Sequence, residues 1–307
     1  METRKLYYED PFQKGFATTV VSCDAVKGGY AVVLAETAFY PEGGGQPYDT
    51  GVLGEANVLE VHEKNGVITH LCDKPFEVGK SVSGKIDWAR RFDHMQQHSG
   101  EHICSGLICE RFHCDNVGFH MGADVVTIDF NADISWDELM EIEQLANLYI
   151  YEDHPIDIQF YRGAELDKVE YRSKKPLEGD VRIVSFPGAD CCACCGTHVV
   201  RSGQVGLVKF LSVQKFRDGV RIELLSGKRA HRYLSECWAQ DVRIAQALSV
   251  KPNASFAGVE RVLAELSALK QRCAKLEESV FAQAAAQYEG KGDVLLFEDE
   301  MSGDILR

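Results

Sequence analysis

Two histidines four residues apart, His98 and His102, constrain the fold of this chain more than any other feature of its sequence. Because the α-helix repeats about every 3.6 residues, both imidazoles would point from one face of a helix and could reach the same divalent metal ion. Cys194 and His198 repeat this spacing far downstream. Three imidazoles and one thiolate form a borderline-soft set of ligands, which suits zinc. The sequence therefore predicts one Zn²⁺ ion per chain, held where two distant segments meet.

The spacing leaves the identity of the thiolate ligand open. Cys194 mirrors the arrangement of the two histidines, but Cys191, Cys192 and Cys195 crowd the same stretch. The cysteine cluster could instead form a structural site that is independent of the histidines. Structural zinc sites usually take their ligands from one local segment, whereas one helix and one distant loop resemble ligands that converge in a cleft.

A second interpretation of the histidine segment is a zinc peptidase. Residues 98–102 read H-x-x-E-H, the inverted metallopeptidase signature, in which Glu101 would accept a proton from water. That interpretation predicts a carboxylate as the third metal ligand, whereas this sequence offers Cys194 and His198. The peptidase stays an alternative, and Glu101 and His120 are the candidate proton carriers for hydrolysis at the site.

Length and composition indicate a folded protein without a membrane partner. The 307 residues suffice for two or three domains, and 45% hydrophobic and 26% charged residues are ordinary for a globular protein. No apolar run approaches the roughly 18 residues that span a bilayer, and the first residues lack the apolar stretch of a signal peptide. We therefore expect a cytoplasmic protein whose eleven cysteines are reduced thiols.

The charge of the chain is unevenly distributed. A net charge of -14 argues against indiscriminate binding of nucleic acids. Residues 199–233 nevertheless hold eight Lys or Arg against two acidic residues. This stretch could bind a phosphate backbone while the remaining surface repels other polyanions, or it could simply form solvated faces of strands and helices.

Residues 1–88 are predicted to form a small β-barrel domain. Asn65-Gly66 is a strong hairpin signal. A loop at 39–47 contains Gly44, Gly45 and Gln46, where the glycines let the backbone approach a ligand closely and the Gln amide offers both a donor and an acceptor. Segments rich in β-branched residues, separated by turns, lie at 17–26, 30–36, 52–62, 67–72 and 81–88.

Residues 89–233 are predicted to form a two-layer α/β domain with an antiparallel sheet, so the fold class is α+β. Its first helix carries the histidines, with Asp93 as the N-cap, and a second helix begins at a capping box formed by Ser135 and Glu138. A short helix is expected at 164–169. Strands are expected at 117–130 (with a turn at 122–124), 155–161, 181–186, 203–210 and 219–225.

Residues 234–289 are predicted to form a helical coiled-coil region. Apolar residues recur in alternating steps of three and four from Val259 to Val280. The pattern covers only about three heptads, so a homodimer through these helices competes with an antiparallel hairpin against residues 228–248. Residues 290–307 contain an apolar segment, VLLF, which we expect to be the start of a truncated C-terminal domain.

Several motifs together resemble one known family. HSGEH followed by CCGTH is similar to the HxxxH and CxxxH motifs of the editing domain shared by alanyl-tRNA synthetases and the freestanding AlaX-type editing proteins. FYPEGGGQPYDTG resembles the barrel signature of that family, and DHMQQHSGEH resembles its freestanding branch. The heptads and VLLF resemble the linker helices and the start of the DHH-associated domain in the long AlaX subgroup. The resemblance covers nearly the whole chain.

The resemblance implies a trans-editing hydrolase that acts on tRNA(Ala) wrongly charged with serine, or with glycine. It also implies that Gly44, Gly45 and Gln46 help to discriminate the amino acid. Synthetase editing domains often carry Thr at the position of Glu101, which leaves the role of this carboxylate open. A tRNA-binding module without catalytic activity is the remaining alternative. Carried over by motif, the zinc ligands would be His98, His102, Cys194 and His198.

Overall fold

The computed structural model describes residues 2–173 and 179–293. Over these residues the chain has the α+β class predicted from the sequence, with several antiparallel sheets and helices. Its internal contacts divide it into two compact units, Met1–Tyr233 and Leu234–Arg307. None of the helices in the described ranges is long and apolar enough to cross a membrane. The predicted domain border at residue 88 stays a prediction.

The first strands of the chain pair into a closed barrel, with β8 pairing back to β2. In order of pairing the strands are β2 (Gly15–Val26), β3 (Gly29–Leu34), β7 (Val67–Cys72), β6 (Ala56–Lys64), β5 (Gly51–Leu53) and β8 (Ser81–Ile86). Asn65 and Gly66 both have positive φ, as the predicted hairpin turn requires. The single strand expected at 52–62 is interrupted at Gly54, whose φ of 55° turns the chain between β5 and β6.

Three shorter elements accompany the barrel. β1 (Arg4–Lys5) and β4 (Glu36–Thr37) form a parallel pair, and α1 (Leu6–Glu9) follows β1 directly. Alternate residues of the long strand β2, such as Phe16 and Val20, are buried in the apolar core of the barrel. This alternation is the pattern of a strand with one buried face.

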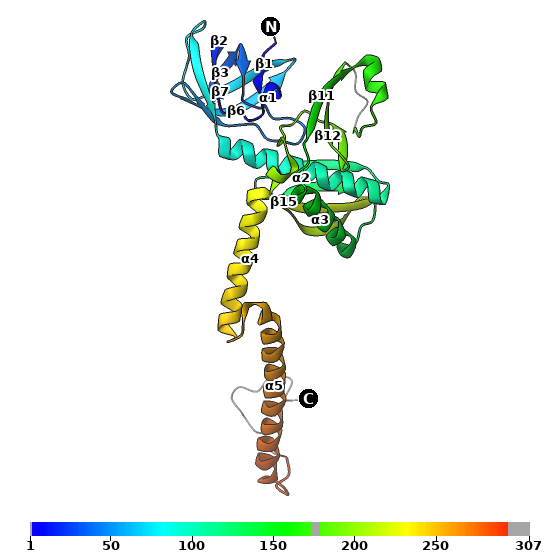
Figure 1. Ribbon diagram of the computed structural model, residues 1–307. Helices are drawn as coiled ribbons and strands as arrows, with labels where there is room; N and C mark the ends of the chain where they lie inside the picture. Colours follow the sequence, from blue (N-terminus) through cyan, green and yellow to red (C-terminus); the bar gives the residue numbers. More distant parts are fainter. Residues whose placement is uncertain (1, 174–178, 294–307) are drawn as a thin grey trace. The chain divides into compact units, whose positions relative to one another are not determined.

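The histidine helix, α2 (Trp88–Phe112), directly follows β8 and begins earlier than predicted. Asp87 is its N-cap, because its carboxylate accepts a hydrogen bond from the backbone N–H of Arg90 at 3.2 Å. The predicted N-cap, Asp93, was wrong: it lies inside the helix, where its carboxylate binds Arg229 at 2.7 Å. In Figure 1, α2 leads from the barrel strands to the remaining elements of the first unit.

A four-stranded antiparallel sheet packs against α2 and α3 (Trp136–Tyr151). Its strands are, in order, β14 (Val208–Phe216), β15 (Gly219–Ser226), β10 (Val126–Phe130) and β9 (Asn116–Met121). The capping box of Ser135 and Glu138 is present at the start of α3, as predicted. The strand expected at 203–210 starts only at Val208, because a 3-10 turn, η2 (Ser202–Val205), and Gly206 with φ 87° precede it.

A three-stranded antiparallel sheet completes the first unit. It consists of β11 (Asp157–Arg162), β12 (Asp180–Phe186) and β13 (Asp190–Ala193), with a 3-10 helix, η1 (Gly163–Lys168), after β11. β13 was not predicted, since its sequence DCCA carries no β-branched residue. It lies against α2 at Gly106, where a Cβ atom would lie 2.0 Å from the carbonyl oxygen of Ala189. This close approach positions the cysteine segment beside the histidine helix.

The last helices are α4 (Gly227–Ala247), which begins in the first unit, and α5 (Ser255–Ala286), which follows a short turn, η3 (Pro252–Ala254). The guanidinium of Arg261 donates to the carbonyl of Leu248 at 2.8 Å and so joins the start of α5 to the end of α4. Apolar heptad residues such as Leu266 and Leu269 are exposed. The homodimer stays a prediction, and the segment 294–307 lies outside the described residues.

A buried ion pair connects the barrel to α2. Arg91 and Asp49 are both wholly buried and bind each other. The Arg91 guanidinium also donates to the carbonyls of Pro11 and Ala38, at 3.0 and 2.5 Å. Asp49 in turn accepts the backbone N–H of Tyr40 at 2.7 Å. The loop at 39–47, which contains Gly44, Gly45 and Gln46, is called the GGQ loop below. The ion pair fixes both ends of the segment that contains this loop against the histidine helix.

We predict that Arg91→Met lowers the free energy of unfolding by about 3–5 kcal/mol, because it leaves the Asp49 carboxylate buried without a partner. Urea denaturation measures the change. The matched control is Arg111→Met, which removes an exposed ion pair with Glu141 and is expected to cost at most about 1 kcal/mol. Equal losses in the two variants would contradict a special role for the buried pair.

Candidate metal centre and its cavity

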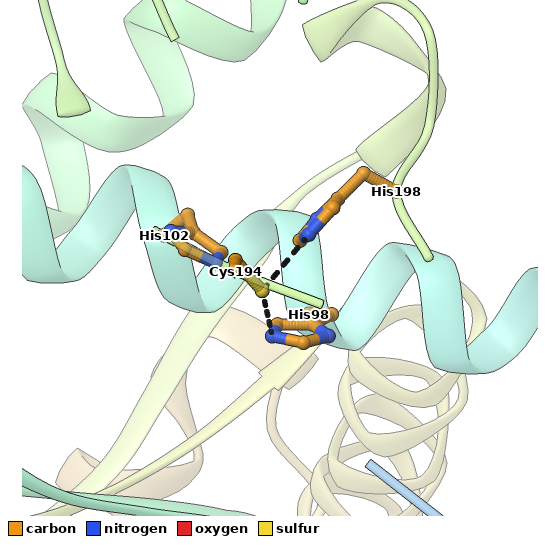
Figure 2. Close-up of side chains that lie close together, drawn as sticks. All are labelled: His98, His102, Cys194 and His198. Carbon is orange, nitrogen blue, oxygen red and sulfur yellow. Dashed lines mark hydrogen bonds between the residues drawn. The ribbon is translucent and has the colours of Figure 1, made fainter. Parts of the chain in front are cut away.

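The structure brings the four predicted ligand residues together. His98 and His102 lie one turn apart on α2, Cys194 follows β13 directly, and His198 lies four residues further on. Their potential ligand atoms all lie within 4.8 Å of one another. The Cys194 Sγ atom is 3.4 Å from His98 Nε2 and 3.3 Å from His198 Nε2. Figure 2 shows the three imidazoles gathered around this sulfur.

Two of the rings are oriented by oxygen atoms on their outer side. His98 Nδ1 lies 2.9 Å from Gln46 Oε1, and His102 Nδ1 lies 2.8 Å from Asp190 Oδ2. An amide oxygen and a carboxylate accept hydrogen bonds, so each places a proton on Nδ1 and leaves the Nε2 lone pair for a metal ion. Histidine ligands in metal sites are oriented in this way. The third ring, His198, has the hydroxyl of Ser99 at 3.4 Å from its Nδ1.

The electrostatics of the cluster favour a thiolate. Burial alone would raise the pKa of Cys194, but His98 and a hydrogen bond from His102 lower this pKa well below its ordinary value. Burial also lowers the pKa of His198 well below its ordinary value, which favours the neutral ring that a metal ion requires. One thiolate and neutral imidazoles are the ligand forms that bind borderline-soft cations.

Asp190 is a buried carboxylate on the outer side of the His102 ring. Burial works against ionisation of this carboxylate, but hydrogen bonds from His102 and Arg172 hold its pKa below the ordinary value. Arg172 binds both carboxylate oxygens at 2.8 Å. Burial lowers the pKa of His102, but the bond to Asp190 outweighs it and raises the pKa well above the ordinary value. A proton on His102 Nε2 would compete with a metal ion for that atom.

A cavity of about 440 Å³ lies beside the cluster. This volume falls within the range of about 300–1,000 Å³ that small-ligand sites occupy. Its wall includes His98, His102 and Cys194, so a bound molecule can reach the cluster. Other residues in its wall are Gly44, Glu101, Asn116, Phe119 and Arg172.

Glu101 and Asn116 form a connected polar pair in this cavity. Glu101 Oε1 accepts hydrogen bonds from Ser105 Oγ at 2.7 Å and from Asn116 Nδ2 at 2.8 Å. Its other oxygen, Oε2, lies 4.0 Å from His102 Nε2. The Oδ1 atom of Asn116 is buried and has no hydrogen-bond partner among the described residues. The pair therefore places a carboxylate in the cavity wall, with a buried, unpaired amide oxygen beside it.

The three residues of the GGQ loop have different environments. Gly44 lines the cavity, as the prediction of a substrate contact requires. Gly45 has φ 85° and packs so tightly that a Cβ would lie 2.6 Å from Phe119 Cδ1. Gln46, in contrast, is wholly buried, and its amide bonds to Thr197 Oγ1 at 2.9 Å as well as to His98. Gln46 therefore orients the His98 ring, and its part in discriminating the amino acid stays a prediction.

The second predicted proton carrier, His120, lies apart from the site. It is exposed on β9 and is not part of the cavity wall. Its neighbour Phe119 faces the cavity and stacks on His98, with 5.0 Å between the ring centres. Successive residues of a strand point to opposite faces, so only one of the two can reach the site.

Sequence reasoning missed several residues that build the site. Asp190 and Ser99 gave no signal, because their role depends on ring orientations that only the folded chain defines. Gly196 could have been found from its place between Cys194 and His198. A Cβ at this position would lie 2.1 Å from His98 Cε1, so only glycine lets the loop pass the ring.

Comparison with known proteins identifies the family. The chain is 31% identical, over 318 residues, to the alanyl-tRNA editing protein AlaX-L of Pyrococcus horikoshii, and the match covers 98% of this chain and 75% of the relative. The chain belongs to the alanyl-tRNA editing protein family. The editing protein Aarsd1-A of Xenopus laevis is 29% identical over 301 residues, which cover 92% of this chain and 73% of that protein.

Family profiles and longer relatives agree with this membership. The profile of class II (A) tRNA synthetases matches residues 12–90, and the profile of the threonyl and alanyl tRNA synthetase second additional domain matches residues 181–223. The alanine–tRNA ligase of Pyrococcus abyssi is 36% identical over 336 residues, which include 100% of this chain but 35% of the ligase. The chain thus spans about a third of the length of the ligases that it matches.

We predict that Gly196→Ala weakens metal binding by about 10- to 100-fold, the usual effect of disturbing the groups that orient a ligand. The new methyl group would displace the His98 ring and also meet Gln46 Oε1 at 2.9 Å. Competition with a chromogenic chelator for Zn²⁺ measures the affinity. The control is Gly43→Ala, whose Cβ would lie 3.6 Å from Tyr40 Oη and disturb nothing. Unchanged affinity in Gly196→Ala would show that the loop can shift without affecting the cluster.

Proposed function

We propose that this protein hydrolyses the aminoacyl ester of tRNA(Ala) that has been wrongly charged with serine, with glycine as a second substrate. One observation carries the proposal: in a member of the alanyl-tRNA editing protein family, a three-histidine, one-cysteine cluster opens onto a cavity with a positioned carboxylate and an unpaired amide oxygen. A metal centre and a proton carrier are groups that an ester hydrolase uses, and the cavity is large enough for a small ligand.

We propose that the ion is zinc, held by His98, His102, Cys194 and His198. The donor set fits this ion, since Nε2 of each ring faces a thiolate and oxygen atoms orient the rings from outside. Bound there, zinc would supply a Lewis acid that polarises water or the ester, or a positive centre that anchors the substrate.

Glu101 is the proton carrier in this proposal. Its Oε1 atom is held by two donors, so Oε2 is the oxygen available on the side of His102. During hydrolysis the water oxygen bonds to the carbonyl carbon, and the bond from that carbon to the ribose oxygen breaks. Glu101 Oε2 would take the proton from the water and return it to the departing ribose oxygen. Holding ester and water together supplies much of the remaining acceleration.

Asn116 is the residue that would distinguish serine from alanine. Its Oδ1 atom can accept a hydrogen bond from the serine hydroxyl, whereas an alanyl or glycyl ester would leave it buried and unpaired, which makes glycine the poorer of the two proposed substrates. An unpaired buried acceptor costs about 1–3 kcal/mol, which corresponds to roughly 5- to 150-fold in selectivity. An enzyme that must leave Ala-tRNA(Ala) intact has to bind the seryl ester better than the alanyl ester.

The peptidase interpretation finds less support. It expected a carboxylate as the third metal ligand, but Cys194 and His198 occupy that side of the cluster. The nearest carboxylate behind the rings, Asp190, binds His102 through Nδ1 and not through the inward Nε2. A tRNA-binding module without catalytic activity is the other alternative, and it would bind tRNA without releasing serine.

We predict that the purified protein releases serine from Ser-tRNA(Ala) and that His102→Ala loses both bound metal and this activity. Rates of deacylation and metal content, measured on the same samples, test the link. Glu101→Gln should retain the metal and slow the reaction by about 10²- to 10⁴-fold, the typical contribution of a general base. A metal-free His102→Ala variant that still released serine would refute the zinc mechanism, and tRNA binding without any release would refute the hydrolase.

We predict that Asn116→Ala lowers the ratio of the deacylation rates for Ser-tRNA(Ala) and Ala-tRNA(Ala) by roughly tenfold, because it removes the acceptor for the serine hydroxyl. Ser105→Ala is the matched control, since it also removes a donor to Glu101 but leaves Asn116 Oδ1 in place. It should slow both substrates equally. A ratio that falls as much in Ser105→Ala as in Asn116→Ala would exclude selection by Asn116.

A further inference from the structure

The basic stretch at 199–233 is mostly neutralised by acidic residues from other parts of the chain. Three of its eight basic residues make no ion pair with any residue in the described ranges: Arg217 in the turn after β14, and Lys228 and Arg232 in α4. Lys228 and Arg232 are exposed near the start of α4. The five ion pairs of the stretch are Arg201–Asp153, Lys209–Glu143, Lys215–Asp133, Arg221–Asp129 and Arg229–Asp93.

Lys228 and Arg232 line a second cavity of about 410 Å³, separate from the one beside the metal cluster. Arg90 and Arg229 add two more positive charges to its wall, and Asp93 contributes the one negative charge. The cavity is therefore strongly basic in a chain whose net charge is -14. Such a local concentration of positive charge on an acidic protein attracts an anion to one place.

A buried histidine in the same wall lacks a partner. His94 is 3% exposed, lines this cavity, and its Nδ1 atom has no hydrogen-bond partner among the described residues. Burial and the neighbouring Arg90 lower the pKa of His94 to about 3, so the ring is neutral. Buried polar atoms are nearly always paired, and a neutral imidazole can donate one N–H to an anionic oxygen.

The basic cavity is adjacent to the proposed catalytic site. His94 lies one helical turn before His98 on α2, a rise of about 6 Å along the helix axis. On the other side the wall contains Pro47, the residue after Gln46. An RNA strand whose 3′-terminal ester lies beside the metal cluster must pass its next phosphates over a neighbouring surface.

We propose that this basic cavity binds a phosphate group of the RNA backbone near the acceptor end of the substrate. The inference rests on the proposed function for the identity of the RNA. Lys228 and Arg232 neutralise the phosphate, and His94 donates a hydrogen bond to it. Because the chain is acidic overall, a few concentrated contacts of this kind hold the RNA in register with the metal cluster.

The test compares the affinity of uncharged tRNA(Ala) for the wild type and for Lys228→Ala/Arg232→Ala at several salt concentrations. We expect Kd to rise about tenfold and the slope of log Kd against log salt to shrink by about 1 to 2, since two phosphate contacts are lost. The matched control is Lys27→Ala/Lys74→Ala, which removes two exposed charges outside the cavity and should leave the slope unchanged.

Deacylation separates this inference from the proposed function. In Lys228→Ala/Arg232→Ala, KM for Ser-tRNA(Ala) should rise while kcat stays at the wild-type value, because the lost contact binds the RNA backbone and takes no part in the hydrolysis of the ester. Wild-type Kd and salt slope in this variant would overturn the phosphate site even if the wild type releases serine. A wild type that releases no serine would refute the editing function, and the Kd comparison would still decide the phosphate site.

Discussion

The cluster depends on the requirement that three imidazoles turn the same nitrogen inward. A histidine ring has two nitrogens, and the partner of the outer nitrogen decides which one is free. Here the outer partners come from three places: Gln46 from the barrel loop, Asp190 from β13 and Ser99 from α2 itself. Each partner is buried, so each ring is fixed in direction before any ion binds. Barrel, helix and small sheet must all be in place for this to happen.

The contacts around Gln46 show how the barrel takes part in the site. Its amide oxygen meets both His98 and the backbone N–H of Thr197, at 2.9 and 3.1 Å, so one side chain joins the two ligand segments. The buried pair of Arg91 and Asp49 fixes the same loop against α2. The barrel therefore serves as a support for the cluster, and a shift of the loop would alter both segments at once.

Spacing predicted the histidines of the cluster, because i, i+4 pairs can be recognised in a sequence before the fold is known, whereas the choice of Cys194 among the neighbouring cysteines rested on the family resemblance. The α+β class and the capping box at Ser135 followed from equally local patterns. The N-cap of α2 was misplaced at Asp93, since both Asp87 and Asp93 suit a helix start and only the end of β8 decides between them. Asp190 could not be predicted, because its partner ring is distant in sequence. The charge of the basic stretch was also misleading, as most of its residues bind acids far away in the chain.

The Asn116 side chain uses both ends of a single amide. Its nitrogen donates to Glu101 and Ser105, while its oxygen is buried without a partner among the described residues. Hydrogen bonds at the two ends of an amide polarise each other, so a donor arriving at the oxygen strengthens the N–H groups on the other side. A hydroxyl that binds there would also tighten the hold on the carboxylate. The side chain that binds the serine hydroxyl and the carboxylate that carries the proton would then be coupled. Binding of a seryl ester would therefore also hold Glu101 more firmly in position for the hydrolysis of that ester.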